Sequence, residues 1–200
     1  MKLIAWDFDG VLNRGFAGGF VLWQQGFEAD LGVSATEFTE YMFGSGRLAD
    51  VLIGRHNLLD LVRDWVAISG VHLTADQMLD YWLQKDARLD GQVLDWLARS
   101  PCPGVIATNN EAHRADFIWN QLGFSARMQR MFASGPLGVR KPDSGFFEAI
   151  ERWSGLEPVE ILLVDDAEKN IAAAKSRGWQ TFHFHDGSRN KLPEVLGITA

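Results

Sequence analysis

The feature that most restricts the fold of this chain is a short apolar run that ends in two aspartates. Residues 3–6 have the composition of a buried strand, and Asp7, Asp9 and Gly10 follow directly. Two carboxylates one residue apart at a strand end reach the same small volume, where they repel each other, and burying them unpaired costs several kcal/mol. A divalent cation relieves such repulsion. A polar turn after an edge strand is the alternative interpretation, since Asp and Gly both favour turns.

Further strand-like runs lie far from the first and alternate with helical patterns. The strand-like runs cover residues 105–107, 131–133, 161–164 and 181–184. The helical patterns cover residues 116–122, 143–153 and 169–177. Strands that alternate with helices form parallel βαβ units. We therefore expect an α/β fold with a Rossmann-like, doubly wound parallel sheet, in which ligands bind outside the carboxyl ends of the strands.

The segment that follows the first strand has a different pattern. Up to about residue 90 it contains no convincing strand, and its apolar residues recur at helical spacing. Thr74 and Gln77 have the spacing of a capping box, which opens a helix. We predict a small helical bundle inserted into the sheet, with the glycine-rich residues 15–20 as a flexible link. The predicted division is 15–90 for the helical bundle, and 1–14 with 91–200 for the core.

Composition limits the partners of the chain. Of its 200 residues, 46% are hydrophobic and 22% are charged, as in globular proteins, and the net charge is −7. That charge argues against nucleic acid as a partner, whereas a small phosphorylated substrate needs only a local positive spot and a metal. The sequence has no apolar run of the ~18 residues that span a bilayer and no signal-peptide pattern. Its single cysteine, Cys102, fits a reducing cytosol. We expect a cytoplasmic protein without a membrane partner, and nothing in the sequence indicates its oligomeric state.

Polar residues also follow the later strand-like runs. Thr108 and Asn109 come after the second run, and Asp165 and Asp166 after the fourth. Lys141 lies just before a predicted helix. Each group alone is a weak signal, because Thr–Asn pairs also cap helices and Lys–Pro is common in loops. The second pair of carboxylates is the most specific of them, since two more acids at a sheet edge again call for a cation.

Taken in order, these groups resemble the four motifs of the haloacid dehalogenase-like (HAD) hydrolase superfamily. DFDGVL is similar to its first motif, ATN to its second, RKP to its third and VDDAEKN to its fourth. The inserted helical bundle looks like the cap of subfamily I. The resemblance covers essentially the whole chain and implies a HAD core with a helical cap and hydrolase activity.

The resemblance also implies catalytic roles for particular residues. Asp7 would attack phosphorus and form an aspartyl-phosphate. Asp9 would protonate the leaving oxygen and then deprotonate the hydrolytic water. Lys141 would supply a positive charge to the phosphate and to Asp7. The Thr108 hydroxyl and the Asn109 backbone N–H would hold phosphate oxygens.

A magnesium ion belongs to the same implied site. The resemblance implies ligation by Asp7, by the backbone carbonyl of Asp9 and by Asp166. Asp165 would be a direct or water-bridged ligand. Oxygen ligands of this kind are those that Mg²⁺ prefers. The expected cofactor is therefore Mg²⁺.

The expected function is a Mg²⁺-dependent phosphatase that hydrolyses a small phosphorylated metabolite, such as a sugar phosphate. Haloacid dehalogenases resemble the chain too, but they lack the second aspartate of the first motif, so Asp9 favours phosphoryl chemistry. The alternatives are a phosphoglucomutase-like phosphoryl transfer and a non-catalytic binding or regulatory module of the same fold. Candidate specificity residues, each of which also has an ordinary surface or hinge interpretation, are Arg14, Arg47, Arg55 and His56.

Overall fold

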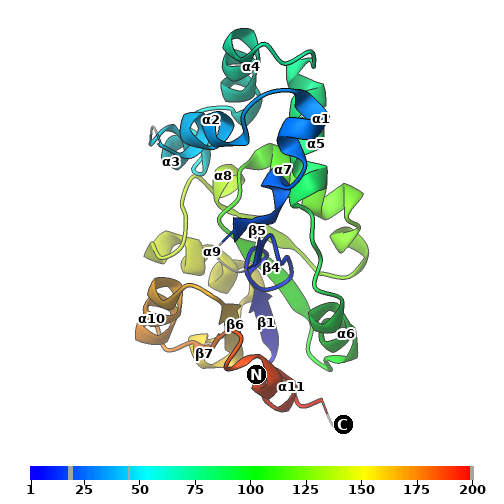
Figure 1. Cartoon of the computed structure of the whole chain (residues 1–200). Coiled ribbons are helices and arrows are strands. Elements are labelled where there is room, and N and C mark those ends of the chain that lie inside the picture. The colour runs from blue at the N-terminus through cyan, green and yellow to red at the C-terminus, as the bar shows by residue number, and fades with distance from the viewer. Residues whose placement is uncertain (18–19, 45, 199–200) are drawn as a thin grey trace.

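A five-stranded parallel sheet organises the structure, a computed structural model that describes residues 1–17, 20–44 and 46–198. Its strands lie in the order β5–β4–β1–β6–β7 (Figure 1). Their bounds, in that order, are Met131–Ala133, Gly104–Thr108, Leu3–Trp6, Ile161–Asp165 and Gln180–His183. Every pairing between neighbours is parallel. The predicted doubly wound α/β sheet is confirmed, and each predicted strand is present.

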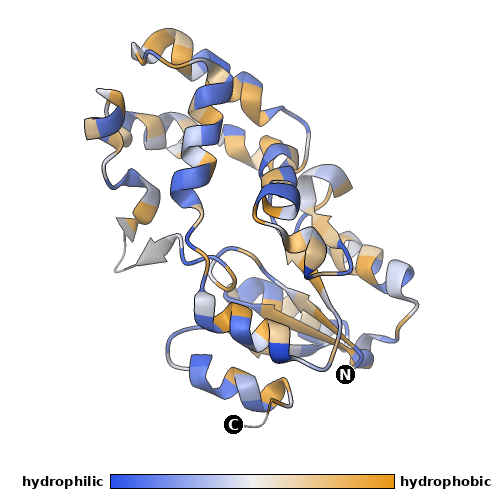
Figure 2. Cartoon of the chain, turned by 90° about the vertical axis from the view of Figure 1, so that its right-hand side faces the viewer, coloured by the Kyte–Doolittle hydropathy of each residue, from blue (hydrophilic) through white to orange (hydrophobic). Residues whose placement is uncertain are grey.

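Both faces of the sheet are buried, because successive residues of a strand point to opposite apolar layers. In β1, Ile4 and Trp6 belong to one layer, and Leu3 and Ala5 to the other. Helices α6 (Gly91–Arg99) and α11 (Leu192–Val195) cover the first layer, and α9 (Ser144–Ser154) and α10 (Glu168–Ser176) cover the second. Figure 2 shows the strands as an apolar centre between these helices.

Between β1 and β4 the chain forms a helical part with its own hydrophobic core. It lies at the top of Figure 1, on the side where β1 ends. Its helices are α1 (Phe27–Leu31), α2 (Ala35–Thr39), α3 (Arg47–Val51), α4 (Leu58–Ser69) and α5 (Ala75–Asp86). A 3-10 turn at Leu22–Gln24 precedes them, and a π-helical turn at Glu40–Gly44 follows α2. Edge-to-face ring contacts join Trp23, Phe38 and Trp82 at the centre of this core.

Local sequence accounts for several of these boundaries. The capping box predicted at Thr74 is confirmed, since its Oγ1 accepts a hydrogen bond from the Gln77 N–H and the Gln77 side chain accepts one from the Thr74 N–H. Gly26 adopts φ +80° and separates the 3-10 turn at Leu22–Gln24 from α1. Trp23 and Phe27 therefore lie on two short elements.

Two further differences from the sequence prediction concern short elements. Phe16–Ala17 (β2) and Phe20–Val21 (β3) form an antiparallel pair where no strand was expected, because two-residue strands are too short to carry a periodic pattern. Residues 18–19 of the predicted flexible link lie outside the described residues. Helix α7 (Ala112–Asp116) begins before residue 116, since Glu111 caps it, and it continues as a π-helical turn at Phe117–Gln121.

The remaining elements are short. They are the helix α8 (Ser134–Leu137) and 3-10 turns at Phe124–Ala126, Pro158–Glu160 and Arg189–Lys191. Among the described residues, no helix combines the length and the apolar character that a membrane crossing requires.

The two crossings between sheet and helical part lie side by side. The Arg14 N–H donates to the Arg88 carbonyl at 2.7 Å, and the Asp90 N–H donates to the Leu12 carbonyl at 2.9 Å. Between them the buried Asn13 side chain accepts from the Arg88 N–H at 2.6 Å and donates to the Asp86 carbonyl at 3.1 Å. These hydrogen bonds form a short ladder around Asn13. The predicted domain boundaries, between residues 14 and 15 and between residues 90 and 91, fall at this ladder. That residues 15–90 act as a separate cap remains a prediction.

Candidate active site

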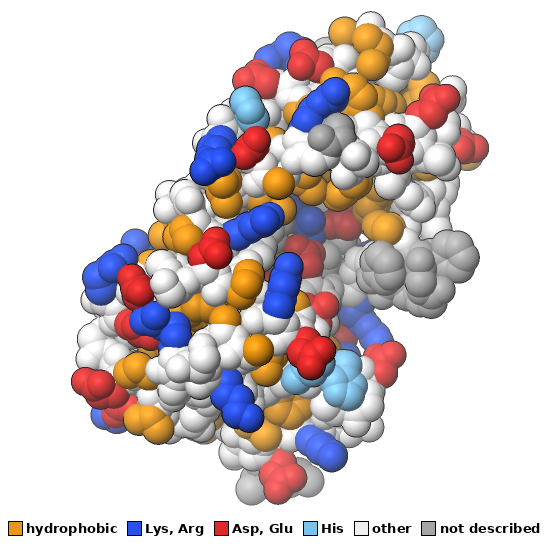
Figure 3. Space-filling view, turned by 90° about the vertical axis from the view of Figure 1, so that its left-hand side faces the viewer, with side chains coloured by type: hydrophobic (Ala, Val, Ile, Leu, Met, Phe, Trp, Pro, Cys, Tyr) orange, Lys and Arg blue, Asp and Glu red, His pale blue; other side chains and the backbone are white. Residues whose placement is uncertain are grey.

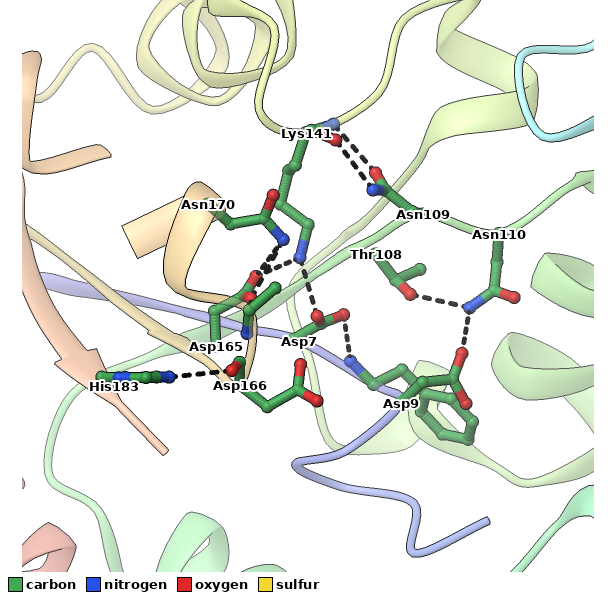
Figure 4. A network of polar contacts seen from close by, with 12 residues as sticks. Asp7, Asp9, Thr108, Asn109, Asn110, Lys141, Asp165, Asp166, Asn170 and His183 are labelled. Carbon is green, nitrogen blue, oxygen red and sulfur yellow. Dashed lines mark hydrogen bonds and ion pairs between the residues drawn. The ribbon is translucent and has the colours of Figure 1, made fainter. Parts of the chain in front are cut away.

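A buried lysine lies between two carboxylates where β1 and β6 end (Figure 4). Asp7 follows β1, Asp165 is the last residue of β6, and Lys141 comes from the loop before α9. The Lys141 Nζ lies 3.0 Å from the Asp7 Oδ2 and 2.5 Å from the Asp165 Oδ2. The parallel sheet thus brings together three residues that are far apart in the sequence, as the motif order predicted.

Charge repulsion persists in this cluster despite the lysine. Burial raises the pKa of Asp7 well above its usual value, the carboxylates of Asp165 and Asp9 raise it further, and Lys141 opposes them. Burial alone would lower the pKa of Lys141, but Asp7 and Asp165 outweigh it and raise that pKa. Burial, followed by the Asp165 carboxylate, also raises the pKa of Asp166. One ammonium therefore does not balance the acids.

The donor set and its spacing fit a small divalent cation. Carboxylate oxygens of Asp7, Asp165 and Asp166 all lie within 4.8 Å of one another. These are hard oxygen ligands, which Mg²⁺ prefers. The turn after β1 is built around the third acid, since Gly10 has φ +78° and a Cβ there would lie 2.2 Å from the Asp166 Oδ2. Only glycine permits this close approach.

Asp165 is more fully engaged than the other acids. Its Oδ1 accepts from the Ala167 N–H at 2.8 Å, and the Asn170 Nδ2 donates to both of its oxygens at 3.0 and 3.1 Å. Together with the bond from Lys141, these contacts fix the Asp165 carboxylate. The geometry suits Asp165 to orienting the lysine, and its assignment as a direct or water-bridged metal ligand stays a prediction.

Replacing Lys141 with alanine is expected to destabilise the metal-free protein by roughly 3–5 kcal/mol, because the change leaves two buried carboxylates without their common partner. Urea unfolding followed by tryptophan fluorescence measures this difference. The control is Lys175→Ala on the exposed side of α10, which is expected to change stability by less than about 0.5 kcal/mol. A Lys141→Ala protein as stable as the control would contradict the buried ion-pair interpretation.

The second predicted motif lies at the end of β4. The Thr108 Oγ1 accepts a hydrogen bond of 2.7 Å from the Asn110 Nδ2. The Asn109 side chain accepts from the Lys141 N–H at 2.8 Å and donates to the Lys141 carbonyl at 2.9 Å. Asn109 therefore positions the backbone that carries the lysine. The predicted phosphate contacts of Thr108 and Asn109 remain predictions.

Three side chains donate hydrogen bonds to Asp9, and Figure 4 shows the one from Asn110. The Asn110 Nδ2 donates to its Oδ2 at 3.0 Å, while the Asn13 Nδ2 and Arg114 Nη2 donate to its Oδ1 at 3.2 and 2.6 Å. The same Arg114 Nη2 pairs with Asp86, the last residue of α5. Arg114 thus links the core acid to the helical part.

Sequence reasoning missed Arg114 and Asp86. Arg114 lies in α7, which begins directly after the second motif, and this closeness in sequence to Asn110 is the signal that could have indicated it. Burial raises the pKa of Asp86, and Arg114 opposes that effect. No local pattern singles out Asp86, because its partners come from distant parts of the chain.

The four candidate specificity residues do not lie together with Asp9. Arg14 pairs with Asp90 at 3.5 Å beside the chain crossings. Arg55 pairs with Asp50 at 3.3 Å on the surface. His56 and Arg47 line a separate surface hollow. A role of these residues in specificity stays a prediction.

The family model of haloacid dehalogenase-like hydrolases matches residues 1–178. The chain belongs to this family. With the site geometry, the match confirms the predicted HAD superfamily membership, and the protein is a HAD-like hydrolase.

Solved structures with the same fold include proteins described in different ways. A HAD family enzyme of Bacteroides thetaiotaomicron, solved with magnesium and inorganic phosphate, is 17% identical over 94% of this chain and 96% of that chain, with a TM-score of 0.75. An L-2-haloacid dehalogenase from Xanthobacter autotrophicus is 16% identical over 100% of this chain and 84% of that chain, with a TM-score of 0.64. At these identities the likeness shows the fold alone.

One curated protein aligns with part of the chain. Drimenol cyclase drtB of Aspergillus calidoustus is 32% identical over 73 residues, which are 36% of this chain. The HAD-like hydrolase spans only 14% of the length of that relative. This match therefore carries no statement about the activity of the chain.

Proposed function

We propose that this HAD-like hydrolase is a Mg²⁺-dependent phosphatase that acts on a small phosphorylated metabolite in the cytoplasm. The observation that carries the proposal is the second aspartate of the first motif, Asp9, held by hydrogen bonds from Asn13, Asn110 and Arg114 beside the Asp7–Lys141 pair. These contacts fix the position of the Asp9 carboxyl group, and hydrolysis of an ester requires a carboxyl group positioned to exchange protons with the leaving oxygen and with water.

The residues divide the reaction into two displacements. An Asp7 carboxylate oxygen attacks phosphorus, the bond to the leaving oxygen breaks, and that oxygen takes a proton from Asp9. Asp9 then takes a proton from water, which attacks the phosphorus of the aspartyl-phosphate and releases Asp7 and inorganic phosphate. Lys141, the Thr108 hydroxyl and the Asn109 N–H hold phosphate oxygens.

Asp7, Asp166 and the Asp9 carbonyl would hold Mg²⁺, with Asp165 beside them as a direct or water-bridged ligand. When bound, the ion screens the negative charges of the nucleophile and the phosphate from each other. The clustered carboxylates of Asp7, Asp165 and Asp166, whose charge Lys141 alone does not balance, support this assignment.

Dehalogenation is the main competing reaction, because a dehalogenase shares the fold. A halide leaves as a stable anion and needs no proton, so that chemistry has no use for Asp9. Phosphoglucomutase-like transfer would use the same aspartyl-phosphate, but it requires a bisphosphate. A non-catalytic module would have no need of the ion-paired nucleophile. The phosphatase is therefore the proposal that uses every group in the site.

The test compares leaving groups directly. With Mg²⁺ present, we expect inorganic phosphate from phosphomonoesters without any bisphosphate activator, and no chloride from 2-chloropropionate. Asp9→Asn is expected to lower ester hydrolysis by about 10²–10⁴-fold, the usual contribution of a general acid–base. Chloride release that survives Asp9→Asn would identify a dehalogenase instead, and absence of both products would favour the binding module.

A further inference from the structure

A cavity of about 370 Å³ adjoins Asp9 between the core and the helical part. On the core side it is lined by Asp9, Gly10 and Arg114. On the helical side its main lining residues are apolar: Val21, Trp23, Phe43 and Trp82. Figure 3 shows a hollow between the two parts of the molecule, with charged side chains deep inside and hydrophobic ones above. The cavity therefore begins at Asp9, the residue that protonates the leaving oxygen in the proposed function.

The polar side chains of this cavity already have partners. Arg114 is paired with Asp9 and with Asp86, which also lines the cavity. The hydroxyl of Thr39, the remaining polar side chain of the lining, donates to the Ala35 carbonyl at 2.7 Å and accepts from the Gln24 Nε2 at 2.8 Å. A sugar has hydroxyls on every side, and those that face the apolar walls would lose water without gaining a partner, because the charged side chains lie only at the core end.

Aromatic side chains form the walls instead. The rings of Trp23 and Trp82 pack edge to face with centroids 5.9 Å apart, and those of Phe43 and Trp82 do so at 6.0 Å. Phe43 is 44% exposed, although it is a large apolar side chain, so part of its ring is available to a ligand. An apolar cavity of about 150 Å³ holds a benzene molecule, so this one, at about 370 Å³, has room for a group about two and a half times that size.

We propose that the cavity binds the leaving group of the substrate, and that this group is an aromatic or branched hydrocarbon rather than a sugar. The inference rests on the proposed function, which places the phosphate at Asp7. It replaces the sugar phosphate of the sequence prediction with an apolar phosphomonoester, and it makes Phe43 a specificity-determining residue.

The experiment compares three esters of primary alcohols, so that the leaving oxygens have similar reactivity. They are 2-(1-naphthyl)ethyl phosphate, glucose 6-phosphate and ethyl phosphate. We expect kcat/KM for the naphthylethyl ester to exceed both others by at least about tenfold, since burial of an aromatic group stabilises its complex by at least that factor. Phe43→Ala is expected to reduce this preference at least about fivefold. Ile68→Ala, a change at a 72% exposed apolar residue of α4, is the control and leaves the preference unaltered.

A binding measurement separates the two proposals. Asp7→Asn protein is titrated with 2-(1-naphthyl)ethylphosphonate, which has no cleavable ester, and tryptophan fluorescence reports binding. Binding that Phe43→Ala weakens, without hydrolysis of any ester by the wild type, would overturn the phosphatase and keep the apolar site. Hydrolysis of glucose 6-phosphate at least as efficient as that of the naphthylethyl ester would overturn the apolar site and keep the phosphatase. A preference that Phe43→Ala leaves intact would also overturn the role of the cavity.

Discussion

Asp7→Asn is expected to abolish turnover while the protein stays folded. The amide is too weak a nucleophile to displace the leaving group, so the aspartyl-phosphate does not form. The variant is expected to retain less than about 1% of kcat, which corresponds to a barrier raised by at least ~3 kcal/mol. Phosphate release under saturating substrate and Mg²⁺ measures the loss. A higher residual rate would rule out covalent catalysis by Asp7.

Stability provides the control for this variant. The asparagine Oδ1 keeps the acceptor for the Phe8 N–H, which donates to Asp7 at 2.7 Å. The substitution also removes a buried charge that Asp165 and Asp9 repel. We therefore expect Asp7→Asn to unfold in metal-free buffer at a temperature no lower than that of the wild type. Asp76→Asn on the exposed first turn of α5 is the matched change, and it is expected to leave both activity and stability unaltered.

Removal of Mg²⁺ is expected to eliminate hydrolysis reversibly. After dialysis against a chelator the activity should be lost, because the negative charges of the acids and of the phosphate repel each other. Added Mg²⁺ should screen this repulsion and restore the activity. Ca²⁺ is expected to substitute poorly, since it takes more ligands at longer distances than Mg²⁺. Full activity in excess chelator would exclude the metal assignment.

Thermal unfolding tests the same assignment without substrate. Mg²⁺ is expected to raise the unfolding temperature of the wild type, because a ligand that binds only the folded state stabilises it. Asp166→Asn is expected to weaken this shift, since it removes one of the clustered carboxylates. Asp186→Asn, at a side chain 95% exposed, is the control and should shift with Mg²⁺ like the wild type. Equal shifts in all three proteins would contradict metal binding at Asp166.

The sheet and its acidic edge could be predicted from the sequence because they rest on local patterns. The central strands β1, β4 and β6 are buried on both faces and therefore appear as continuous apolar runs, as in 161–164. In a parallel sheet all such runs end at the same edge, so the residues that follow them meet. The meeting of Asp7 with Asp165 and Asp166 could be expected for this reason, whereas the contact of Lys141 with Asp7 was implied only by the resemblance to the HAD motifs.

The surroundings of Asp9 could not be predicted in the same way. Arg114 contacts Asp9, which is more than a hundred positions away in the sequence, and Asp86, which is about thirty positions away. No periodic pattern in the sequence predicts such contacts. The residues that line the cavity come from several short elements of the helical part, among them the π-helical turn that carries Phe43. Only its charge makes Arg55 a candidate in the sequence, and the charge of a residue does not predict the direction in which its side chain points.

The ladder around Asn13 has a consequence for how such a protein can diversify. These hydrogen bonds place the two ends of the insertion next to each other, so the sheet can form in the same way for insertions of different length and structure. The entropy of closing a loop grows only slowly with its length, so a longer or shorter insertion alters the stability of the sheet little. The helical part can therefore be exchanged as a unit, while Asp7, Lys141 and Asp166 stay in place. If this part binds the leaving group as we propose, its exchange would change what the molecule recognises without rebuilding the chemistry at the sheet edge.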